Sequence, residues 1–459
     1  MSQNSVIAVI DIGKTNAKVA FVDEKLLTEI AVVTQQNQVL PSPPYPHFDI
    51  DNIYQFIISS LSKYAAEFDI KAISVTTHGA CCALIDGDGE LVAPVMDYEF
   101  EGLESTSASY DKVRPEFRET GSPKLPVGLN LGAQIFWIFD NFSEIKTQTR
   151  QIVTYAQYWS FKLTGILKNE LTSLGCHTDL WDPYNATYSS MVHKLGWLDK
   201  MAPVAKANEQ LGMILPQVSL QTGLKSDMPV YCGIHDSNAS LLPHLMTENA
   251  PFSVVSTGTW VIAMAIGGAQ IELDPKRDTL INVNGLGEPV PSARFMGGRE
   301  FETLMANRCD KFDPSDVDFI LQNEVMLLPS IMQNSGPFQG QHHRWTVEPS
   351  SLTDGQYFAA VSFYLALMTA SCLSLIGAKG KNIVEGPFSQ NTLYCDMLAT
   401  AISSHVQPSR GTGTSVGAAL LTMDNFEQST DVCLEQFEAS QYLRAYAKNW
   451  IRIVTERHH

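Results

Sequence analysis

Two apolar runs of strand character open the chain, and a short polar turn joins them. The runs are SVIAVIDIG (residues 5–13) and AKVAFVDEKL (residues 17–26). Two β-rich runs joined by such a turn predict a β-hairpin. Apolar residues at helical spacing follow over residues 48–66, and a further buried strand is predicted over residues 70–77.

The same order of patterns returns in the second half of the chain. Residues 251–268, PFSVVSTGTWVIAMAIGG, again give strand, small polar turn and strand, and residues 382–402 give a strand that turns into a helix. A chain of 459 residues also exceeds a single ordinary core. We therefore predict an approximate internal duplication of the α/β class, with domains at residues 1–245 and 246–459.

Three other segments have a clear pattern. A long helical stretch is predicted from about residue 133 to residue 163, and residues 228–237 form an apolar strand that ends on a His and an Asp. Residues 357–377 are apolar and long enough to span a bilayer. Because serines and a threonine dilute this segment and it stands alone, we interpret it as a buried core helix.

Composition and charge limit the classes of binding partner and the cellular compartment that we expect. The formal net charge of -18 argues against a nucleic-acid partner, because phosphates favour a positive surface. The eight cysteines have neither CxxC nor zinc-site spacing, which favours reduced thiols and a cytoplasmic location. The N-terminal apolar stretch stops at Asp11 and is too short for a signal peptide. We expect a cytoplasmic protein that binds neither nucleic acid nor membrane.

Both predicted hairpin turns are candidates for binding phosphate. The first turn holds Gly13, Lys14, Thr15 and Asn16, and the second holds Thr257, Gly258 and Thr259. Backbone N–H groups and hydroxyls converge in such turns, and that arrangement suits phosphate oxygens. Neither turn has Walker A spacing, and neither has the GxGxxG spacing of a dinucleotide fold. A pair of plain hairpin turns is the alternative interpretation.

Asp236 is the candidate for acid–base chemistry. It follows the apolar strand PVYCGI, so its carboxylate lies at the carboxyl end of a strand, where α/β proteins bind ligands. A carboxylate there can accept the proton of an attacking hydroxyl during phosphoryl transfer. A strand-end cap is the alternative for Asp236, and a structural core histidine is the alternative for the adjacent His235.

An ordered set of motifs gives the chain a family resemblance. DIGKTNAK, TTHGA, GIHDSNAS, STGTW, VEGPFSQN and GTSVGAALL follow one another from Asp11 to Leu421. The set resembles the FGGY carbohydrate kinases of the hexokinase, Hsp70 and actin superfamily. The resemblance implies two actin-like, ribonuclease H-like domains with the active site in the interdomain cleft. It also implies ATP and Mg²⁺ as cofactors and a small-molecule sugar as substrate, and it leaves open a homodimer.

The resemblance also assigns roles to residues. Asp236 matches the general base, and Asp11, together with Asp236, matches the metal site. The two turns match the phosphate loops. The motif VEGPFSQN matches the adenosine site, and GTSVGAALL matches the glycine-rich helix start that follows it. The adenosine-site residues are Gly386, Pro387, Gln390 and Asn391, and the sugar-site residues are His78, Gly79, Tyr98, Glu99, His235 and Asp236.

The chain departs from the family pattern at two places. Pro387 and Phe388 stand where small glycines usually let adenine approach, and Glu99 and Phe100 replace an Asn-Asp pair.

The His-Asp pair and STGTW resemble rhamnulokinases and fuculokinases. The resemblance therefore implies a kinase for a ketose such as L-fuculose, L-rhamnulose, ribulose or xylulose. A regulatory ATPase of the same superfamily, or a sugar-binding relative without efficient turnover, is the alternative. The segment FMGGREFE (295–302) either faces the site or caps a helix.

Overall fold

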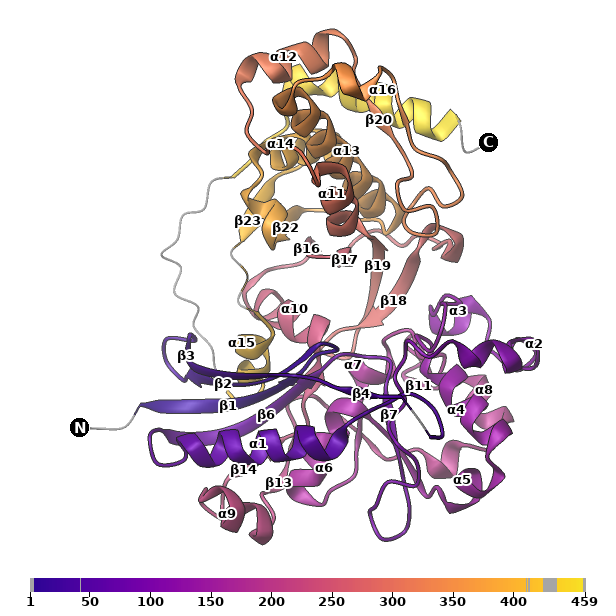
Figure 1. The fold of residues 1–459 in the computed structure, drawn as a ribbon, viewed down its shortest axis with the longest axis vertical. Coiled ribbons are helices and arrows are strands. Elements are labelled where there is room, and N and C mark those ends of the chain that lie inside the picture. Colours follow the sequence, from indigo (N-terminus) through magenta and orange to yellow (C-terminus); the bar gives the residue numbers. More distant parts are fainter. Residues whose placement is uncertain (1–3, 42, 410, 412, 424–435, 457–459) are drawn as a thin grey trace. The chain divides into compact units, whose positions relative to one another are not determined.

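The computed structural model describes residues 4–41, 43–409, 411, 413–423 and 436–456. The chain divides into two compact units (Figure 1). Unit 1 contains the described residues of 1–247, 281–289 and 412–428, and unit 2 contains those of 248–280, 290–411 and 429–459. The first change of unit therefore follows residue 247, close to the predicted division after residue 245, and two later segments join unit 1.

A seven-stranded mixed sheet forms the centre of unit 1. Its main path runs β13-β14-β6-β1-β2-β3, and β15 also pairs with β6. The strands β1, β2 and β3 are antiparallel neighbours, as the hairpin pattern predicts, whereas β6 is parallel to β1. The bounds are β1 Ser5–Ile12, β2 Asn16–Asp23, β3 Glu29–Gln36, β6 Asp69–Thr77, β13 Gln210–Met213, β14 Pro229–Tyr231 and β15 Ile234–His235.

Helices cover both faces of this sheet. The helices α1 (Ile50–Tyr64) and α6 (Tyr155–Thr164) lie on one face, and α10 (Asp236–Thr247) and α15 (Gly413–Leu420) lie on the other (Figure 1). The alternation along β1 explains this arrangement, because successive side chains of a strand point to opposite faces. Ala8 packs in the core under α1, whereas Ile7 and Val9 pack with Ala239 of α10.

The predicted helical stretch from residue 133 to residue 163 is not continuous. It contains α4 (Leu131–Asn141), α5 (Ser143–Gln148), the strand β8 (Gln151–Thr154) and α6. The prediction of one long helical segment was therefore wrong. The strand β8 pairs antiparallel with β7 (Cys82–Ile85), so tertiary pairing overrides the helical pattern there.

The smaller elements of unit 1 connect these layers. They are β4 Val39–Leu40, β5 His47–Phe48, η1 Glu101–Thr106, α2 Ser107–Tyr110, α3 Phe117–Thr120, β9 Asn169–Glu170, α7 Leu171–Leu174, β10 Trp181–Asp182, β11 Thr187–Tyr188, α8 Ser190–Lys194, η2 Leu198–Lys200, β12 Val204–Ala205 and α9 Pro216–Thr222.

The sheet centred on unit 2 repeats the pairing pattern of unit 1. Its order is β18-β19-β17-β16-β22-β23, with β16, β17 and β19 antiparallel and β22 and β23 parallel to β16 and to each other. The predicted duplication is therefore present in the strand order. The bounds are β16 Phe252–Thr257, β17 Val261–Ile266, β18 Thr279–Val283, β19 Pro289–Phe295, β22 Lys381–Glu385 and β23 Val406–Ser409.

The apolar helix α13 (Asp354–Leu375) forms the core of unit 2. Thr353 caps its first turn and forms a capping box with Gln356. Among the described residues it is the one helix with the length and apolar composition to cross a membrane, and 83% of its apolar window is buried inside the protein. It packs against α14 (Thr392–Ile402) and α12 (Pro314–Gln322) as a core helix. The remaining elements are η3 Pro275–Arg277, α11 Gly297–Met305, β20 Leu327–Leu328, β21 Arg344–Trp345, η4 Pro349–Ser351, η5 Pro387–Gln390 and α16 Gln441–Glu456.

Candidate functional site

Asp11 lies next to the end of β1 and is held by two partners. Thr414 at the start of α15 donates a hydrogen bond from Oγ1 to Asp11 Oδ2 at 2.5 Å, and Lys18 Nζ of β2 lies 3.2 Å from the same oxygen. Burial raises the pKa of Asp11, and the nearby Asp236 carboxylate also raises it, while Lys18 and Thr414 lower it. The sequence did not indicate Thr414 as a partner of Asp11.

The first polar turn is tight and internally bonded. The Gly13 N–H donates to the Asn16 carbonyl at 2.9 Å, and the Asn37 side chain donates to the Gly13 carbonyl at 2.6 Å. Thr15 and Asn16 are exposed. The turn thus has the hairpin geometry that both interpretations of the sequence require.

Asp236 begins α10 directly after β15. Its Oδ1 accepts a hydrogen bond from the Ser237 backbone at 2.6 Å and lies 3.2 Å from Nε2 of His235. About a third of the Asp236 side chain, 32%, is exposed, so a ligand can reach it. Burial of the rest raises the pKa of this carboxyl, and the nearby His78 lowers it. A carboxylate with a raised pKa is suited to accept a proton.

Two histidines accompany Asp236. His78 follows β6, donates through Nδ1 to the Gly79 carbonyl at 2.7 Å, and leaves a buried Nε2 without a hydrogen-bond partner in the described residues. Burial lowers the pKa of His78 and lowers that of His235 to about 4. Both rings are therefore neutral near pH 7. Gly79 leaves room for the His235 ring, since a Cβ there would lie 2.9 Å from Nε2 of His235.

A buried acid that the sequence analysis missed supports His235. The Glu170 side chain accepts hydrogen bonds from Thr172 N at 2.8 Å and Thr172 Oγ1 at 2.7 Å. Thr172 Oγ1 in turn accepts the backbone N–H of His235 at 3.0 Å. Burial raises the pKa of Glu170 to about 7. No sequence motif indicated Glu170 or Thr172, because their role depends on the contact between α7 and β15.

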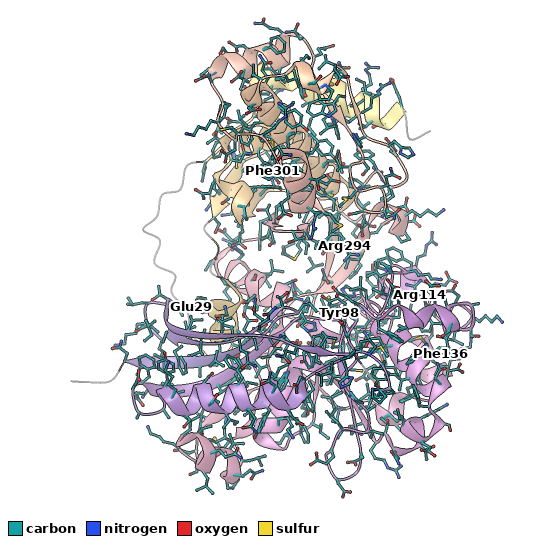
Figure 2. All side chains as sticks on the ribbon, viewed as in Figure 1. Glu29, Tyr98, Arg114, Phe136, Arg294 and Phe301 are labelled. Atoms are coloured by element: carbon teal, nitrogen blue, oxygen red, sulfur yellow. The ribbon has the colours of Figure 1, made fainter. Side chains whose placement is uncertain are left out.

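Lys14 extends from the first turn to the predicted sugar residues. Its Nζ lies 4.7 Å from the centre of the Tyr98 ring, and Figure 2 labels that ring in unit 1. It also pairs with Asp97 and lies 3.3 Å from Oε2 of Glu99. The Tyr98 ring packs 5.5 Å from that of His78. Unit 1 therefore brings together Lys14, His78, Tyr98 and Glu99, and it adds Asp97, which the sequence did not single out.

Unit 2 contains a cavity at the second polar turn. Its volume is about 540 Å³, and its wall includes Gly298 and Phe301 of α11, the latter labelled in Figure 2. Of the predicted nucleotide residues, those that line it are Thr257, Gly258, Thr259, Pro387, Gln390 and Asn391. The FMGGREFE segment thus contributes to this cavity and also begins a helix. Phe312, Phe358 and Phe388 give the cavity an aromatic wall suited to a flat ring.

Gly386 supports the cavity without lining it. It has a φ of +83°, and a Cβ there would lie 1.9 Å from the Thr257 carbonyl oxygen. Thr257 Oγ1 donates to the Glu385 carbonyl and accepts from the Phe388 N–H at 3.1 Å. The second turn and the VEGPFSQN segment are therefore joined by hydrogen bonds. Phe388 is 6% exposed and packs on Tyr394, so only a small part of its ring contributes to the cavity wall.

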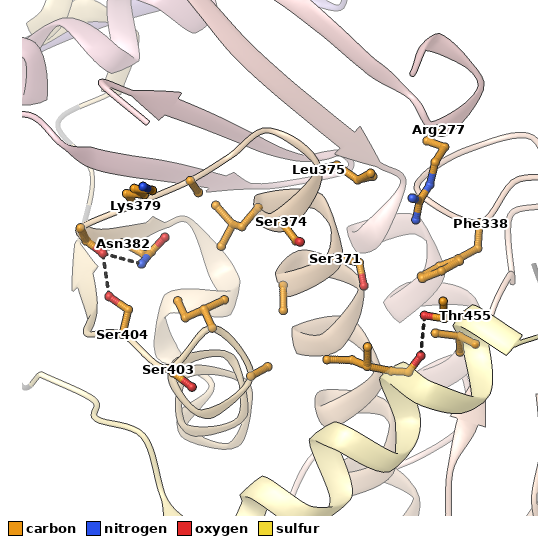
Figure 3. Close-up of a pocket in the computed structure, with 18 residues that line it drawn as sticks. Arg277, Phe338, Ser371, Ser374, Leu375, Lys379, Asn382, Ser403, Ser404 and Thr455 are labelled. Atoms are coloured by element: carbon orange, nitrogen blue, oxygen red, sulfur yellow. Dashed lines mark hydrogen bonds between the residues drawn. The ribbon is translucent and has the colours of Figure 1, made fainter. Parts of the chain in front are cut away.

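A larger cavity of about 710 Å³ lies elsewhere in unit 2 (Figure 3). Arg277, Lys379 and the last turns of α13, α14 and α16 line it, and none of the predicted site residues does. Arg277 donates from Nε to the Pro337 carbonyl at 2.9 Å. The residues that line this cavity include no carboxylate of the kind that Asp236 supplies.

Comparison with known protein families covers most of the chain. Residues 6–243 match the N-terminal domain of the FGGY family of carbohydrate kinases, and residues 249–431 match the carbohydrate kinase FGGY C-terminal domain. The chain belongs to the FGGY family of carbohydrate kinases. The family resemblance of the motif set is thereby confirmed.

Individual relatives agree with the FGGY assignment. A carbohydrate kinase structure from Novosphingobium aromaticivorans is 33% identical, covers 99% of both chains and has a TM-score of 0.92. An L-fuculokinase from Salmonella typhi is 23% identical over 58% of this chain and 57% of its own length. The chain thus matches little more than half the length of such curated relatives. A gluconate kinase structure from Lactobacillus acidophilus, 15% identical over 99% and 96% of the two chains, shares the fold with a TM-score of 0.79.

The carboxylates of this FGGY chain fit a divalent cation. Burial raises the pKa of both Asp11 and Asp236, and the nearby Asp236 carboxylate further raises the pKa of Asp11. A cation beside them would offset the cost of burying negative charge. Mg²⁺ usually takes only one or two protein carboxylates and completes its shell with water and phosphate oxygens. In the described residues, no cluster of three or more His, Cys, Asp or Glu side chains offers a metal cage.

Proposed function

We propose that this chain transfers the γ-phosphate of ATP to a hydroxyl group of a ketose. The observation that carries the proposal is the Asp236 carboxylate, partly exposed, raised in pKa and held beside His235 in a chain of the FGGY family. Asp236 accepts the proton of the sugar hydroxyl while the hydroxyl oxygen forms a bond to the γ-phosphorus. The bond between that phosphorus and the β,γ-bridging oxygen breaks, and ADP leaves.

The remaining residues bind and orient the reactants. Asp11, with Asp236, would hold Mg²⁺, which supplies charge neutralisation on the phosphates. The exposed Thr15 and Thr259 hydroxyls and backbone N–H groups of the two turns bind phosphate oxygens. The cavity of unit 2 binds the nucleoside, with Gln390 and Asn391 as polar groups and Phe301 on the wall. The buried Nε2 of His78, which is an acceptor, pairs with a sugar hydroxyl.

The proposed substrates are L-fuculose and L-rhamnulose first, followed by ribulose and xylulose. The L-fuculokinase relative and the resemblance of the His235-Asp236 pair to rhamnulokinases support this order. We further propose that the enzyme acts in the cytoplasm on free sugars. Homodimer formation remains a prediction.

The test measures ADP release with ATP and Mg²⁺ over a panel of ketoses, polyols and aldonates. We expect release that depends on a ketose and falls to the background rate without sugar. Release that ignores the sugar would favour a regulatory ATPase, and sugar binding without release would favour a relative that lacks turnover. The second alternative rests on Pro387 and Phe388, which line the cavity where the family usually has small glycines. The panel therefore also includes other nucleoside triphosphates in place of ATP.

A further inference from the structure

The ammonium group of Lys14 lies against aromatic rings, a position that is unexpected for the lysine of a phosphate-binding turn. Its ammonium group is over the Tyr98 ring and 5.2 Å from the centre of the Phe48 ring. His78 packs against both of these rings, at 5.3 Å from Phe48 and 5.5 Å from Tyr98. The lysine therefore projects from the first turn into the group of aromatic and histidine side chains at the proposed sugar site.

Asp97 holds Lys14 in this position. Asp97 is 6% exposed, and its backbone N–H donates to the Pro46 carbonyl at 2.9 Å. Its Oδ1 pairs with Lys14 Nζ and also accepts the Glu99 backbone N–H at 3.1 Å. The Asp97 carboxylate thus positions both the Lys14 ammonium group and the backbone N–H of Glu99. We refer to Lys14, Asp97 and Glu99 as the charged clasp.

The clasp offers both kinds of hydrogen-bonding group to a ligand. Glu99 is 64% exposed at its side chain, so its carboxylate oxygens can accept hydrogen bonds from hydroxyls. An ammonium group has three N–H donors, of which Asp97 and Glu99 use two. The third donor can be shared with a hydroxyl oxygen. Neighbouring hydroxyls of one sugar can therefore donate to Glu99 and accept from Lys14.

The charge balance around the clasp is negative. Its two carboxylates outnumber its one ammonium group. The other lysine of the first hairpin, Lys18, lies 3.2 Å from both Asp11 Oδ2 and Glu29 Oε1. Both lysines are thus paired with two carboxylates each, and Asp236 adds a further negative charge. A carboxylate or phosphate on the substrate would be repelled here.

We propose that Lys14 and Glu99, positioned by Asp97, determine specificity by binding vicinal hydroxyls of a neutral sugar and rejecting sugar acids and sugar phosphates. This inference rests on the proposed kinase function and specifies its substrate class. The fold does not decide between these classes, since it is shared with a gluconate kinase. The clasp distinguishes between these substrate classes. A ligand without matching hydroxyls would leave the charged groups of the clasp without hydrogen-bond partners.

The experiment compares substitutions in the full chain. Glu99→Gln removes charge from an exposed side chain, Lys14→Met keeps the apolar stem over Tyr98, and Asp97→Asn releases the lysine. Glu101→Gln is the matched control, because Glu101 is an exposed acid two residues from Glu99. For each variant we measure kcat and KM with the best ketose and with its aldonate, ketose binding by calorimetry without nucleotide, and the melting temperature.

The expected results differ between variants. With Glu99→Gln, ketose KM should rise roughly 10- to 100-fold with little change in kcat, as expected when a charged hydrogen-bond partner is lost. Its aldonate-to-ketose ratio of kcat/KM should also rise, because a negative charge is gone. Lys14→Met should weaken ketose binding to a similar extent without raising that ratio, and Asp97→Asn should resemble it. Glu101→Gln should match the wild type.

Two kinetic outcomes overturn the inference. One is a Glu99→Gln variant with the ketose KM and the aldonate ratio of Glu101→Gln, and the other is a wild type that prefers the aldonate. Failure of the kinase proposal looks different, since no sugar would then stimulate ADP release from the wild type. Calorimetry still tests the clasp in that case, because weaker ketose binding by Glu99→Gln than by Glu101→Gln would support it and equal binding would overturn it.

Discussion

Thr414 and Asp11 are 403 residues apart in the sequence, yet the threonine hydroxyl donates to the aspartate carboxylate at 2.5 Å. The contact lies within unit 1, because the start of α15 packs on β1. Gly417 also lets α15 pack closely on α10, since a Cβ there would lie 1.7 Å from the Ala239 carbonyl oxygen. One oxygen of the proposed metal-binding carboxylate is therefore oriented by a helix from the far end of the chain.

Replacing Thr414 should change the metal requirement. Thr414→Val removes the donor to Asp11 and should raise the Mg²⁺ concentration for half-maximal activity several-fold, whereas Thr414→Ser keeps the hydroxyl and should restore it. Asp11→Ala should both raise the Mg²⁺ requirement and depress turnover, because it removes one of the two carboxylates that would hold the ion. Mg²⁺ titrations of the three variants test this. Identical titrations for the Val and Ser variants would show that the hydrogen bond does not orient Asp11 for the metal.

Asp236→Asn should remove the general base while preserving the shape of the site. We expect kcat to fall by about 100-fold or more, in line with general-base contributions, and sugar binding by calorimetry to change little. Because burial raises the pKa of Asp236, wild-type kcat should decrease as the pH falls through that raised value. The residual activity of Asp236→Asn should lack this decrease. Near-normal turnover in the variant would remove Asp236 from the role of base.

The two hairpins were predictable because each depends on local pattern. In residues 5–26 and in residues 251–268, two apolar runs flank a short polar turn. Both segments form the antiparallel strand pair that this pattern predicts. The stretch from residue 133 to residue 163 was not predictable, since the pairing of β8 with β7 is a contact between segments distant in sequence. The grouping of α15 with unit 1 was missed for the same reason.

The candidate site was also only partly predictable, because contacts between segments distant in sequence are not visible in the sequence. Asp11 and Asp236 stood out because each ends or follows an apolar strand, a pattern visible in the sequence. Glu170 and Asp97 did not, because their significance comes from burial and from partners far along the chain. An exposed loop acid and a buried one look alike in a sequence without structure. Residues that position other residues are therefore the ones that sequence reasoning missed.

Gly298→Ala should weaken nucleotide binding. A Cβ at Gly298 would lie 2.0 Å from the Gly258 carbonyl oxygen, so the second turn and α11 must move apart at the cavity. We expect the Kd for the ATP analogue AMP-PNP to rise at least several-fold, while sugar binding in unit 1 stays unchanged. Gly87→Ala is the control, because nothing lies within 4 Å of a Cβ there. Equal nucleotide affinity in the two variants would contradict the assignment of this cavity.

Glu300 should make stability depend on pH. Burial raises the pKa of Glu300 to about 7 from an ordinary 4.5, although Tyr364 donates to its Oε2 at 2.8 Å. The folded state therefore binds this proton more tightly than the unfolded state does. The resulting stabilisation is complete below about pH 4.5 and is lost as the pH rises through about 7.

Thermal unfolding of wild type and Glu300→Gln from pH 4.5 to 8 tests this linkage. The difference in melting temperature between them should move in favour of the variant as the pH rises, and it should level off above pH 7. Glu302→Gln is the control, because the Glu302 side chain is 67% exposed. A wild-type-to-variant difference that is constant over this pH range would contradict the raised pKa.

Thr172 should act on catalysis through His235 rather than through contact with substrate. Its hydroxyl donates to Glu170 and accepts from the His235 N–H, so Thr172→Val leaves that backbone group unpaired beside the proposed base. We expect kcat to fall by roughly 10-fold or more, since small displacements of a catalytic group are costly. Thr172→Ser keeps both hydrogen bonds and should recover most of the activity. Nucleotide affinity should be normal in both variants, because the cavity belongs to unit 2. Equal loss in the Val and Ser variants would mean that the methyl group matters for packing and that the hydrogen-bonded path from Glu170 to His235 does not position the site.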